Sequence, residues 1–350
     1  MSKSEKSKKR SKYLFVLIIL TAILSITTTY TWFSARRDVE ISNLEVNVEA
    51  AKDMQISLDG EHWKQSITIS DMAQLYGTVA TEGTIQAKAG DNYNYVPTAM
   101  IPASSVGEVE NGKLQLVTGT ISGKTLSGIT LCSEADITAE ATVTTKEGNN
   151  SKHPYLVFDL YLKNMSEKAT DSLYLKSGSR VFVGDNGTAD TGVEYSSRVA
   201  FVPYSTTADL MASGEAVRDI VGVVADTTAV IWEPNHLHHT AYLVANNDRG
   251  INAQSQEFET YGVTADAAGQ TVSDITVTSD PLLAKQTVLT PAYDLANGTT
   301  ADQDLGITIA GDKISKVRVY FWLEGQDPDC VDNASLGKEI AATIKLEKGE

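Results

Sequence analysis

The sequence predicts an all-β protein: an antiparallel β-sandwich of jelly-roll type with long loop excursions, preceded by one N-terminal hydrophobic helix. Short runs in which apolar and polar residues alternate recur along the chain, and this period is typical of half-buried strands. The links between these runs are rich in Gly, Ser, Thr and Asn, which favour turns. No repeat of about 20 to 50 residues is visible, so the pattern does not support a solenoid or a propeller.

The N-terminus is expected to direct export. Residues 1–12 are basic, and an uncharged apolar block follows from Tyr13 to Ile26. This order of segments is the layout of a secretory signal, whose basic side stays in the cytoplasm. We therefore expect residues 36–350 to form an extracellular β-sandwich domain, secreted or at the cell surface. We expect one elaborated domain with an insertion around 236–300, although two smaller domains stay an alternative.

Residues 13–35 fit either a signal peptide or an N-terminal membrane anchor. The apolar core has the length of a signal h-region, but the uncharged run to Ala35 is about long enough to span a ~30 Å hydrocarbon layer as a helix. We favour cleavage just after the threonine run. Retention stays open because Tyr30, Trp32 and Phe33 crowd the cleavage region and suit a membrane interface.

The composition argues against a nucleic-acid partner. The formal net charge is -16, and the segment before Tyr13 holds six of the 29 Lys and Arg but one of the 45 Asp and Glu, so the body is more acidic still. Nucleic-acid affinity depends on Lys and Arg that neutralise phosphates. An acidic body suits a soluble surface or matrix protein.

The two cysteines, Cys132 and Cys330, are candidates for a disulfide in an exported protein. Closing so long a loop would stabilise the fold by roughly 4 to 5 kcal/mol in the chain-entropy model. The alternative is two buried thiols.

The first expected strand follows the export segment directly. It contains Val39, Ile41, Leu44, Val46 and Val48. The alternation shifts by one residue at Asn43-Leu44, which predicts a bulge or bend, since a one-residue slip moves side chains to the opposite face. Such a strand could pass from one sheet to the other, or from one subunit to the next.

Further elements follow from the same patterns. Asp59-Gly60 predicts a hairpin turn after an alternating run, and a helical turn capped by Asp71 is expected over 71–76. Weak helical spacing appears over 208–217. The remaining strands are expected at 85–88, 114–117, 128–132, 137–143, 154–162, 173–175, 181–183, 197–202, 221–232, 316–323 and 340–346.

Two of these strands show their faces clearly. In 154–162 one face is fully apolar and the other is amphipathic, because Asp159 lies among Tyr155, Val157 and Tyr161. In 316–323 the apolar side chains of Val317, Val319, Phe321 and Leu323 alternate with Arg318, Tyr320 and Trp322.

Two groups of side chains are candidate metal ligands. His236, His238 and His239 could share a metal, but the helical His-Glu-x-x-His arrangement of a hydrolytic zinc site is absent. Glu324, Asp327 and Asp329 crowd a turn before Cys330, and calcium prefers such oxygen clusters, but the spacing is not that of an EF-hand. A polar loop and ordinary turn chemistry are the simpler interpretations, so we expect no cofactor and keep calcium as the alternative.

No pattern indicates an enzyme. Neither a Gly-x-Ser-x-Gly elbow nor a phosphate-binding glycine loop occurs. Trp63, Trp232 and Trp322 lie on or beside expected strands, where core packing is the simpler interpretation and a sugar-binding platform the alternative.

The stretch Thr29-Tyr30-Thr31-Trp32-Phe33-Ser34, followed by an alternating strand, resembles the TasA and camelysin family of Gram-positive surface and biofilm-matrix proteins. The resemblance covers about the first fifty residues and continues only as β content and acidity. It implies export with a signal trimmed by a dedicated signal peptidase. It also implies a jelly-roll subunit that polymerises into fibres by donating its N-terminal strand to a neighbour. Camelysin-type members are described as metalloproteases, but no matching protease motif is present here.

We therefore expect a non-catalytic secreted or cell-surface structural protein, a fibre-type matrix subunit or its relative. Its partners would be further copies of itself or other matrix proteins, with membrane contact through the N-terminal helix before cleavage. One alternative is an anchored adhesin or carbohydrate-binding module that uses exposed aromatic residues. A second is a metal-dependent hydrolase centred on His236 to His239.

Overall fold

The structure is a computed structural model. It describes residues 43–50, 54–78, 81–82, 99–100, 102–110, 113–122, 125–131, 152–184, 187–221, 229–246, 261–263, 283–285, 293–294, 298–299, 301–325, 327, 329–330 and 339–349. The expected export segment, with Val39 and Ile41, and the expected strands at 85–88 and 137–143 lie outside these residues. Among the described residues, no helix is long and apolar enough to cross a membrane.

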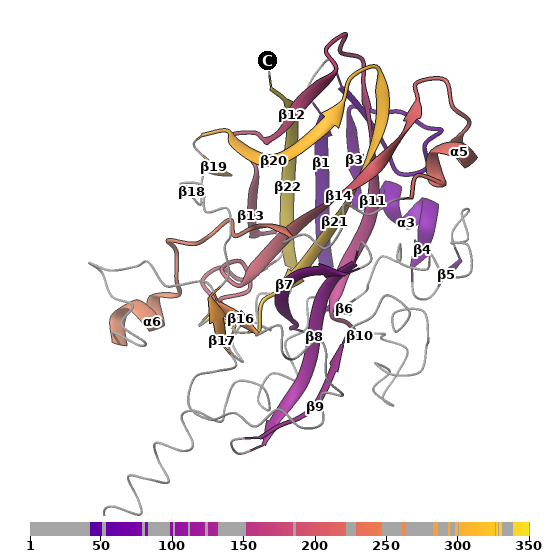
Figure 1. The fold of residues 1–350 in the computed structure, drawn as a ribbon. Helices are drawn as coiled ribbons and strands as arrows, with labels where there is room; N and C mark the ends of the chain where they lie inside the picture. The colour runs from indigo at the N-terminus through magenta and orange to yellow at the C-terminus, as the bar shows by residue number, and fades with distance from the viewer. Residues whose placement is uncertain are drawn as a thin grey trace, which may run out of the picture.

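The described part of the chain is mostly β, and two main sheets form its body (Figure 1). In sheet A the strands lie in the order β20-β12-β22-β1-β3, with β13 also paired to β22. Their bounds are β1 Asn43–Ala50, β3 Ser66–Thr68, β12 Thr170–Leu175, β13 Arg180–Val183, β20 Gln303–Ala310 and β22 Glu339–Lys348.

Sheet B has the order β15-β14-β21-β11-β2, and all its described pairs are antiparallel. Its bounds are β2 Met54–Ser57, β11 Tyr155–Asn164, β14 Ser197–Asp209, β15 Val230–Trp232 and β21 Lys313–Leu323. The longest pairings join β21 to β11 and to β14, so β21 runs through the middle of the sheet.

The main core lies between the two sheets. Sheet B contributes the inward side chains of β11 and β21, and sheet A contributes those of β12, β20 and β22. The expected inward faces are confirmed, because Leu156, Phe158, Leu160 and Leu162 of β11, and Val317, Val319, Phe321 and Leu323 of β21, all belong to this core. Alternation therefore identified the core faces correctly.

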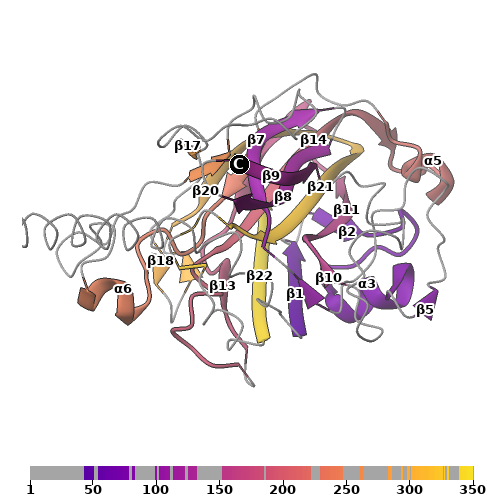
Figure 2. The same ribbon diagram turned by 90° about the horizontal axis from the view of Figure 1, so that it is seen from below.

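The other face of sheet B is covered as well (Figure 2). A third sheet packs on part of it, with strands β7 Ser104–Glu110, β8 Lys113–Ser122 and β9 Thr125–Leu131. Ala103, Val109, Leu114 and Leu116 form an apolar cluster with the outward side chains of sheet B, including Trp322. Helix α5, Gly214–Arg218, covers another part of the same face near Tyr161. Strands β11 and β21 are therefore buried on both faces.

The turn at Asp59-Gly60 differs from the expected hairpin. The chain does reverse, since Ile56 and Lys64 form an antiparallel bridge, and Gly60 has a φ of 72°. The two arms then separate, because β2 belongs to sheet B and β3 to sheet A. The turn thus connects the two sheets at the edge of the sandwich instead of closing a hairpin.

Helix α3, Ile69–Tyr76, confirms the expected helical turn but not its cap. The Asp71 backbone N–H donates to Thr68 Oγ1 at 3.3 Å, and Asp71 Oδ2 accepts from the Thr68 backbone N–H at 2.9 Å. This reciprocal pair is a capping box. The cap is therefore Thr68, and Asp71 is the residue that reaches back to it.

The remaining described elements are short. Helix α6 spans Ala241–Asn246, and the helical spacing expected over 208–217 is realised only as α5. The short strand pairs are β4 Gly77–Thr78 with β5 Thr81–Glu82, β6 Ala99–Met100 with β10 Lys152–His153, β16 Tyr261–Val263 with β17 Leu283–Lys285, and β18 Tyr293–Asp294 with β19 Gly298–Thr299.

Candidate functional site

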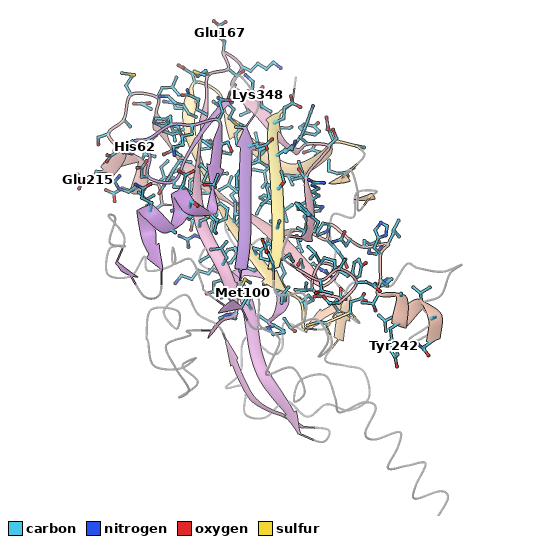
Figure 3. The ribbon with its side chains drawn as sticks, turned by 180° about the vertical axis from the view of Figure 1, so that it is seen from behind. His62, Met100, Glu167, Glu215, Tyr242 and Lys348 are labelled. Atoms are coloured by element: carbon cyan, nitrogen blue, oxygen red, sulfur yellow. The ribbon has the colours of Figure 1, made fainter. Side chains whose placement is uncertain are left out.

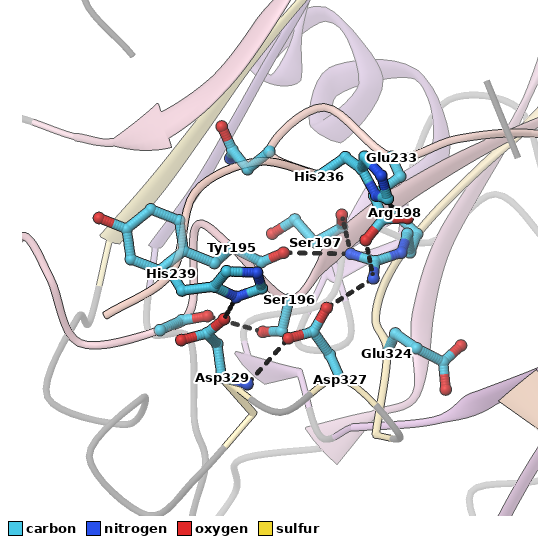
Figure 4. A network of polar contacts seen from close by, with 12 residues as sticks. Tyr195, Ser196, Ser197, Arg198, Glu233, His236, His239, Glu324, Asp327 and Asp329 are labelled. Carbon is cyan, nitrogen blue, oxygen red and sulfur yellow. Dashed lines mark hydrogen bonds and ion pairs between the residues drawn. The ribbon is translucent and has the colours of Figure 1, made fainter. Parts of the chain in front are cut away.

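A buried polar cluster lies at one end of sheet B. Because β14 runs antiparallel to β15 and β21, the start of β14 meets the ends of both neighbours: Ser197 pairs with Leu323, and Val199 pairs with Trp232. The segments before β14 and after β15 and β21 therefore converge at this end. We call their charged and imidazole side chains the base cluster: Glu194, Arg198, Glu233, His236, His239, Glu324, Asp327 and Asp329. Figure 4 labels all of these residues except Glu194.

Arg198 is the centre of the base cluster. Arg198 is 2% exposed, and its Nη2 lies 2.5 Å from Glu233 Oε1 and 2.5 Å from Asp327 Oδ2. Its Nη1 donates to the backbone carbonyls of Tyr195 at 3.1 Å and Ser197 at 3.0 Å. Burial alone lowers the pKa of this guanidinium, but the neighbouring carboxylates outweigh it and raise the pKa. The arginine therefore stays charged inside the protein.

The acidic turn after β21 is fixed by its own hydrogen bonds. Glu324 Oε2 accepts from Trp322 Nε1 at 3.1 Å and from the Ser105 backbone N–H at 3.0 Å. Asp327 Oδ1 accepts from the Asp329 backbone N–H at 2.8 Å, and the Asp327 backbone N–H donates to the Glu324 carbonyl at 3.1 Å. These hydrogen bonds hold the residues in a turn, and Glu324 also attaches the third sheet to sheet B.

His239 and Asp329 form a second buried pair within the base cluster. His239 Nδ1 lies 2.5 Å from Asp329 Oδ2, and the side chains are 5% and 0% exposed. Asp329 Oδ1 accepts from the Thr240 backbone N–H at 2.8 Å. Burial raises the pKa of Asp329, the contact with His239 lowers it, and the neighbouring Asp327 raises it further, with a net upward shift. This pair holds the segment before α6 against the acidic turn.

Glu194 adds a carboxylate with an unusual environment. Its Oε1 accepts from the Asp190 backbone N–H at 2.8 Å, whereas its buried Oε2 has no hydrogen-bond partner among the described residues. Burial raises the pKa of Glu194, and the charges of Asp190 and Asp329 add to that rise. A proton on Glu194 would reduce the excess negative charge of the base cluster.

The structure joins two groups that the sequence presents separately. The histidines at 236–239 and the acidic turn at 324–329 meet through His239 and Asp329. His236 lies on the other side of the base cluster, with its Nδ1 3.5 Å from Glu233 Oε2, and His238 is held through its backbone N–H by the Asn235 carbonyl. Within the described part of the chain, no three His, Cys, Asp or Glu side chains are arranged to hold a metal ion.

Sequence reasoning missed Arg198, Glu194 and Glu233. Arg198 is the one charge in the apolar run Ser197-Arg198-Val199-Ala200-Phe201-Val202. A charge inside such a run predicts a buried partner, because an unpaired ion is expensive to bury. That signal identifies the arginine but not its carboxylates, which lie 35 and 129 positions further along the chain.

The two serines beside the base cluster, Ser196 and Ser197, are not arranged for nucleophilic catalysis. The Ser196 hydroxyl donates to the Gly192 carbonyl at 2.9 Å, and the Ser197 hydroxyl donates to the Val193 carbonyl at 2.8 Å. A catalytic serine would instead present its hydroxyl to a base and to an open site. The arrangement holds three loops together at the end of sheet B.

The candidate cysteines and tryptophans lie outside the base cluster or outside the described residues. Cys330 is buried beside the acidic turn, and Cys132 lies outside the described residues, so the disulfide stays a prediction. Trp232 and Trp322 are both 0% exposed, which confirms core packing for them. Trp63 is partly exposed, and the Lys163 ammonium lies 5.0 Å from its ring centroid.

Comparisons with protein-family models, with curated proteins and with solved structures gave no match. The fold and the site therefore define the class of this protein: it is a mostly β protein whose loops are joined by a buried ionic cluster.

Proposed function

We propose that this protein is a non-catalytic, exported structural protein of the cell surface or extracellular matrix, and that its copies assemble through strand β1. The proposal includes a jelly-roll arrangement of sheets A and B. It also includes export through the signal-like segment that precedes β1.

The observation that supports self-assembly is the position of β1. It pairs in parallel with β22 over eight residues and antiparallel with β3 over three, and the other described pairs of sheet A are antiparallel. Figure 3 shows β1 beside β22 in the middle of the sheet. The strand thus fills a slot between two others while only residues 51–53 connect it to β2. An equivalent strand from a second copy would make the same backbone hydrogen bonds.

The burial of the base cluster supports a non-catalytic role. Arg198, His239 and Asp329 are nearly inaccessible, and each is held by an ion pair within the protein, Arg198 with Asp327 and His239 with Asp329. A site for chemistry on an external substrate would need an open approach to such groups. The carbohydrate-binding alternative is weakened for the same reason, because Trp232 and Trp322 are buried, and of the described tryptophans Trp63 alone retains an exposed surface.

A cysteine exchange experiment tests the proposal. Glu49 of β1 and Lys345 of β22 are register partners, and their charged groups lie 3.4 Å apart. The exported protein would be prepared as two variants, Glu49→Cys and Lys345→Cys, which are co-assembled and then oxidised. If β1 is donated between copies, a disulfide-linked dimer forms that requires both variants, and electron microscopy shows fibres.

The controls separate strand donation from chance oxidation. The double variant Glu49→Cys/Lys345→Cys tests whether the two positions can be bridged at all. Mixing Glu49→Cys with Lys168→Cys places the second thiol on an exposed lysine in the link before β12, so no mixed dimer is expected. Monomers in electron microscopy under every salt and pH condition, with bridging only inside the double variant, would contradict self-assembly.

A further inference from the structure

A small pocket lies between the turn at 57–64 and helix α3, away from the base cluster. Figure 3 shows His62 on the side of the molecule that carries α3. The pocket has a volume of about 240 Å³, which is smaller than the ~300 to 1,000 Å³ of sites for drug-sized ligands. Its lining residues are Leu58, Asp59, His62, Lys64, Ile67, Asp71, Gln74 and Leu75.

The floor of the pocket is apolar. Leu58 and Ile67 are buried side chains of the main core, and Leu75 of α3 is partly buried against that core. A branched aliphatic group of a ligand placed here would contact these side chains, and its apolar surface would be removed from water. Such contact favours binding in proportion to the apolar area removed from water.

One side of the rim is the Asp59–His62 pair. Asp59 Oδ1 accepts from Ser57 Oγ and from the backbone N–H groups of Glu61 and His62, each at 2.8 Å. Asp59 Oδ2 lies 2.6 Å from His62 Nδ1. Burial alone would raise the pKa of Asp59, but these hydrogen bonds lower it to about 2. The carboxylate is thus already occupied, and it orients the imidazole through Nδ1. In the protonated imidazolium, Nε2–H is a second donor.

The other side of the rim is the Lys64–Asp71 pair. Lys64 Nζ lies 2.6 Å from Asp71 Oδ1, and Asp71 Oδ2 accepts from the Thr68 backbone N–H at 2.9 Å and from Thr68 Oγ1 at 3.1 Å. An ammonium group has three N–H donors, and the Asp71 contact uses one of them. Both carboxylates of the rim are therefore occupied by protein donors, whereas the two cationic groups keep donors for a ligand.

We propose that this pocket binds a small aliphatic carboxylate. Its carboxylate would accept hydrogen bonds from Lys64 Nζ and His62 Nε2, and its aliphatic body would lie on Leu58, Ile67 and Leu75. Charge-assisted hydrogen bonds of this kind are the stronger ones available to a protein, and the apolar floor selects an acid with a short hydrocarbon body. The inference is independent of self-assembly.

Ligand-observed NMR titration of the full exported chain tests the proposal. The probes are 3-methylbutanoate and, as a matched pair with one apolar body, N-acetyl-leucine and N-acetyl-leucinamide. Saturable binding is expected for the two acids, and at least tenfold weaker binding for the amide. Tighter binding of N-acetyl-leucine than of 3-methylbutanoate would identify the peptide C-terminus as the source of the carboxylate, and the reverse order a free acid.

Matched variants assign the binding to this pocket. Lys64→Met keeps the aliphatic stem and removes the charge, and should weaken binding of the acids about tenfold or more. Lys168→Met removes a lysine that is also exposed, whose Nζ lies 3.8 Å from Asp171 Oδ1, and should leave binding unchanged. Thermal unfolding of both variants checks that the fold is retained.

The pH dependence provides a second readout. The hydrogen bond that His62 Nδ1–H donates to Asp59 raises the pKa of His62, so its imidazolium persists above the usual range and is lost as the pH rises through that pKa. Binding of the acids should weaken across that transition, and His62→Gln should abolish the change. The charged groups around His62 are Asp59 and Glu61 of its own turn, Lys64, Asp71 of α3, and Arg218 of α5, which pairs with Glu61.

Three results would overturn the proposal. They are the absence of saturable binding by either acid, equal binding of N-acetyl-leucine and its amide, and equal loss of binding in Lys64→Met and Lys168→Met.

Discussion

At the scale of single residues, two buried ionic sites lie on the outer face of sheet B. Arg198 of β14 lies opposite Trp322 in the register, and Asp159 of β11 lies opposite Arg318. The Arg318 guanidinium contacts Asp159 through Nε at 2.7 Å and Nη2 at 3.1 Å, and Lys316 Nζ adds a contact of 2.8 Å. Breaking such a pair leaves an uncompensated charge inside the protein, which costs more than the pair itself contributes.

Asp159 makes the stability of the fold sensitive to acid. Burial alone would raise its pKa, but the charges of Arg318 and Lys316 and their hydrogen bonds lower it to about 2. Because the folded pKa lies below the unfolded value, this stabilisation is present above pH 3.8 and is lost as the pH falls through about 2. Its size is about 2 kcal/mol by linkage.

Asp159→Asn should therefore lower the free energy of unfolding at pH 7 by about 3 to 5 kcal/mol, since Arg318 and Lys316 lose their buried counter-ion. The substitution should also reduce the decrease in the free energy of unfolding between pH 4 and pH 2 by about 2 kcal/mol. Urea unfolding across this range measures both effects. Asp209→Asn, which alters an exposed ion pair with Lys313, is the control. It should change neither the free energy of unfolding at pH 7 nor its pH dependence by a comparable amount. An unchanged acid transition in Asp159→Asn would contradict this account.

Arg198→Met tests the base cluster. The methionine keeps an apolar stem of similar length but leaves Glu233 and Asp327 buried together without their cation. We expect a loss of about 3 to 5 kcal/mol in the free energy of unfolding, measured by urea titration followed by tryptophan fluorescence. Arg180→Met is the matched control, because this arginine stacks on Phe182 at 4.2 Å at a partly exposed position. Equal losses in the two variants would show that Arg198 adds little to holding the three loops.

At the scale of the elements, the buried charges fix the register of sheet B. Every second residue of β21 faces the main core, and Arg318 lies between Val317 and Val319. A slip of one residue would move Arg318 and its neighbours Lys316 and Tyr320 into that core. The charges on the outer face thus act against misregistered pairings, which an entirely apolar strand would permit.

The strands that the sequence predicts best are the long alternating ones. Strands β11, β21 and β22 were all expected, because their patterns extend over enough residues to exclude other periods. Strand β20 was missed, although Leu305, Ile307 and Ile309 alternate with polar residues, because Gly306 interrupts a short run. The 221–232 run is described as a strand only at β15, Val230–Trp232. Residues 222–228 lie outside the described residues.

The candidate site was less predictable than the strands. The acidic turn and the histidines could be identified from their residue types, but their meeting depends on the order β15-β14-β21, which no local pattern specifies. The pairing of His239 with Asp329 spans 90 positions in sequence. The separation of β2 and β3 into different sheets could not be predicted either. An Asp-Gly turn has the same local chemistry whether it closes a hairpin or connects two sheets.

At the scale of the whole molecule, β1 connects the two sheets to the segment that precedes the described fold. Its backbone places Leu44, Val46 and Val48 opposite Ile340, Ala342 and Ile344 of the last strand, β22. Those three partners are buried in the main core, and so is Val48. The first and last strands of the described fold therefore close the core together, whether β1 comes from the same copy or from a neighbour.

Val48→Asp should disrupt this closure. Val48 is 0% exposed, and an aspartate there would lie in the main core beside Ile67 and Ile344, where no described basic side chain is part of the packing. Since a buried unpaired carboxylate costs several kcal/mol, we expect the free energy of unfolding to fall by more than about 3 kcal/mol. Fibres should be lost under conditions in which the parent protein forms them. Glu49→Gln, at the neighbouring half-exposed position, should retain both properties. Thermal unfolding and electron microscopy of the two exported variants decide the matter: unchanged stability and assembly in Val48→Asp would remove β1 as the strand that closes the sandwich.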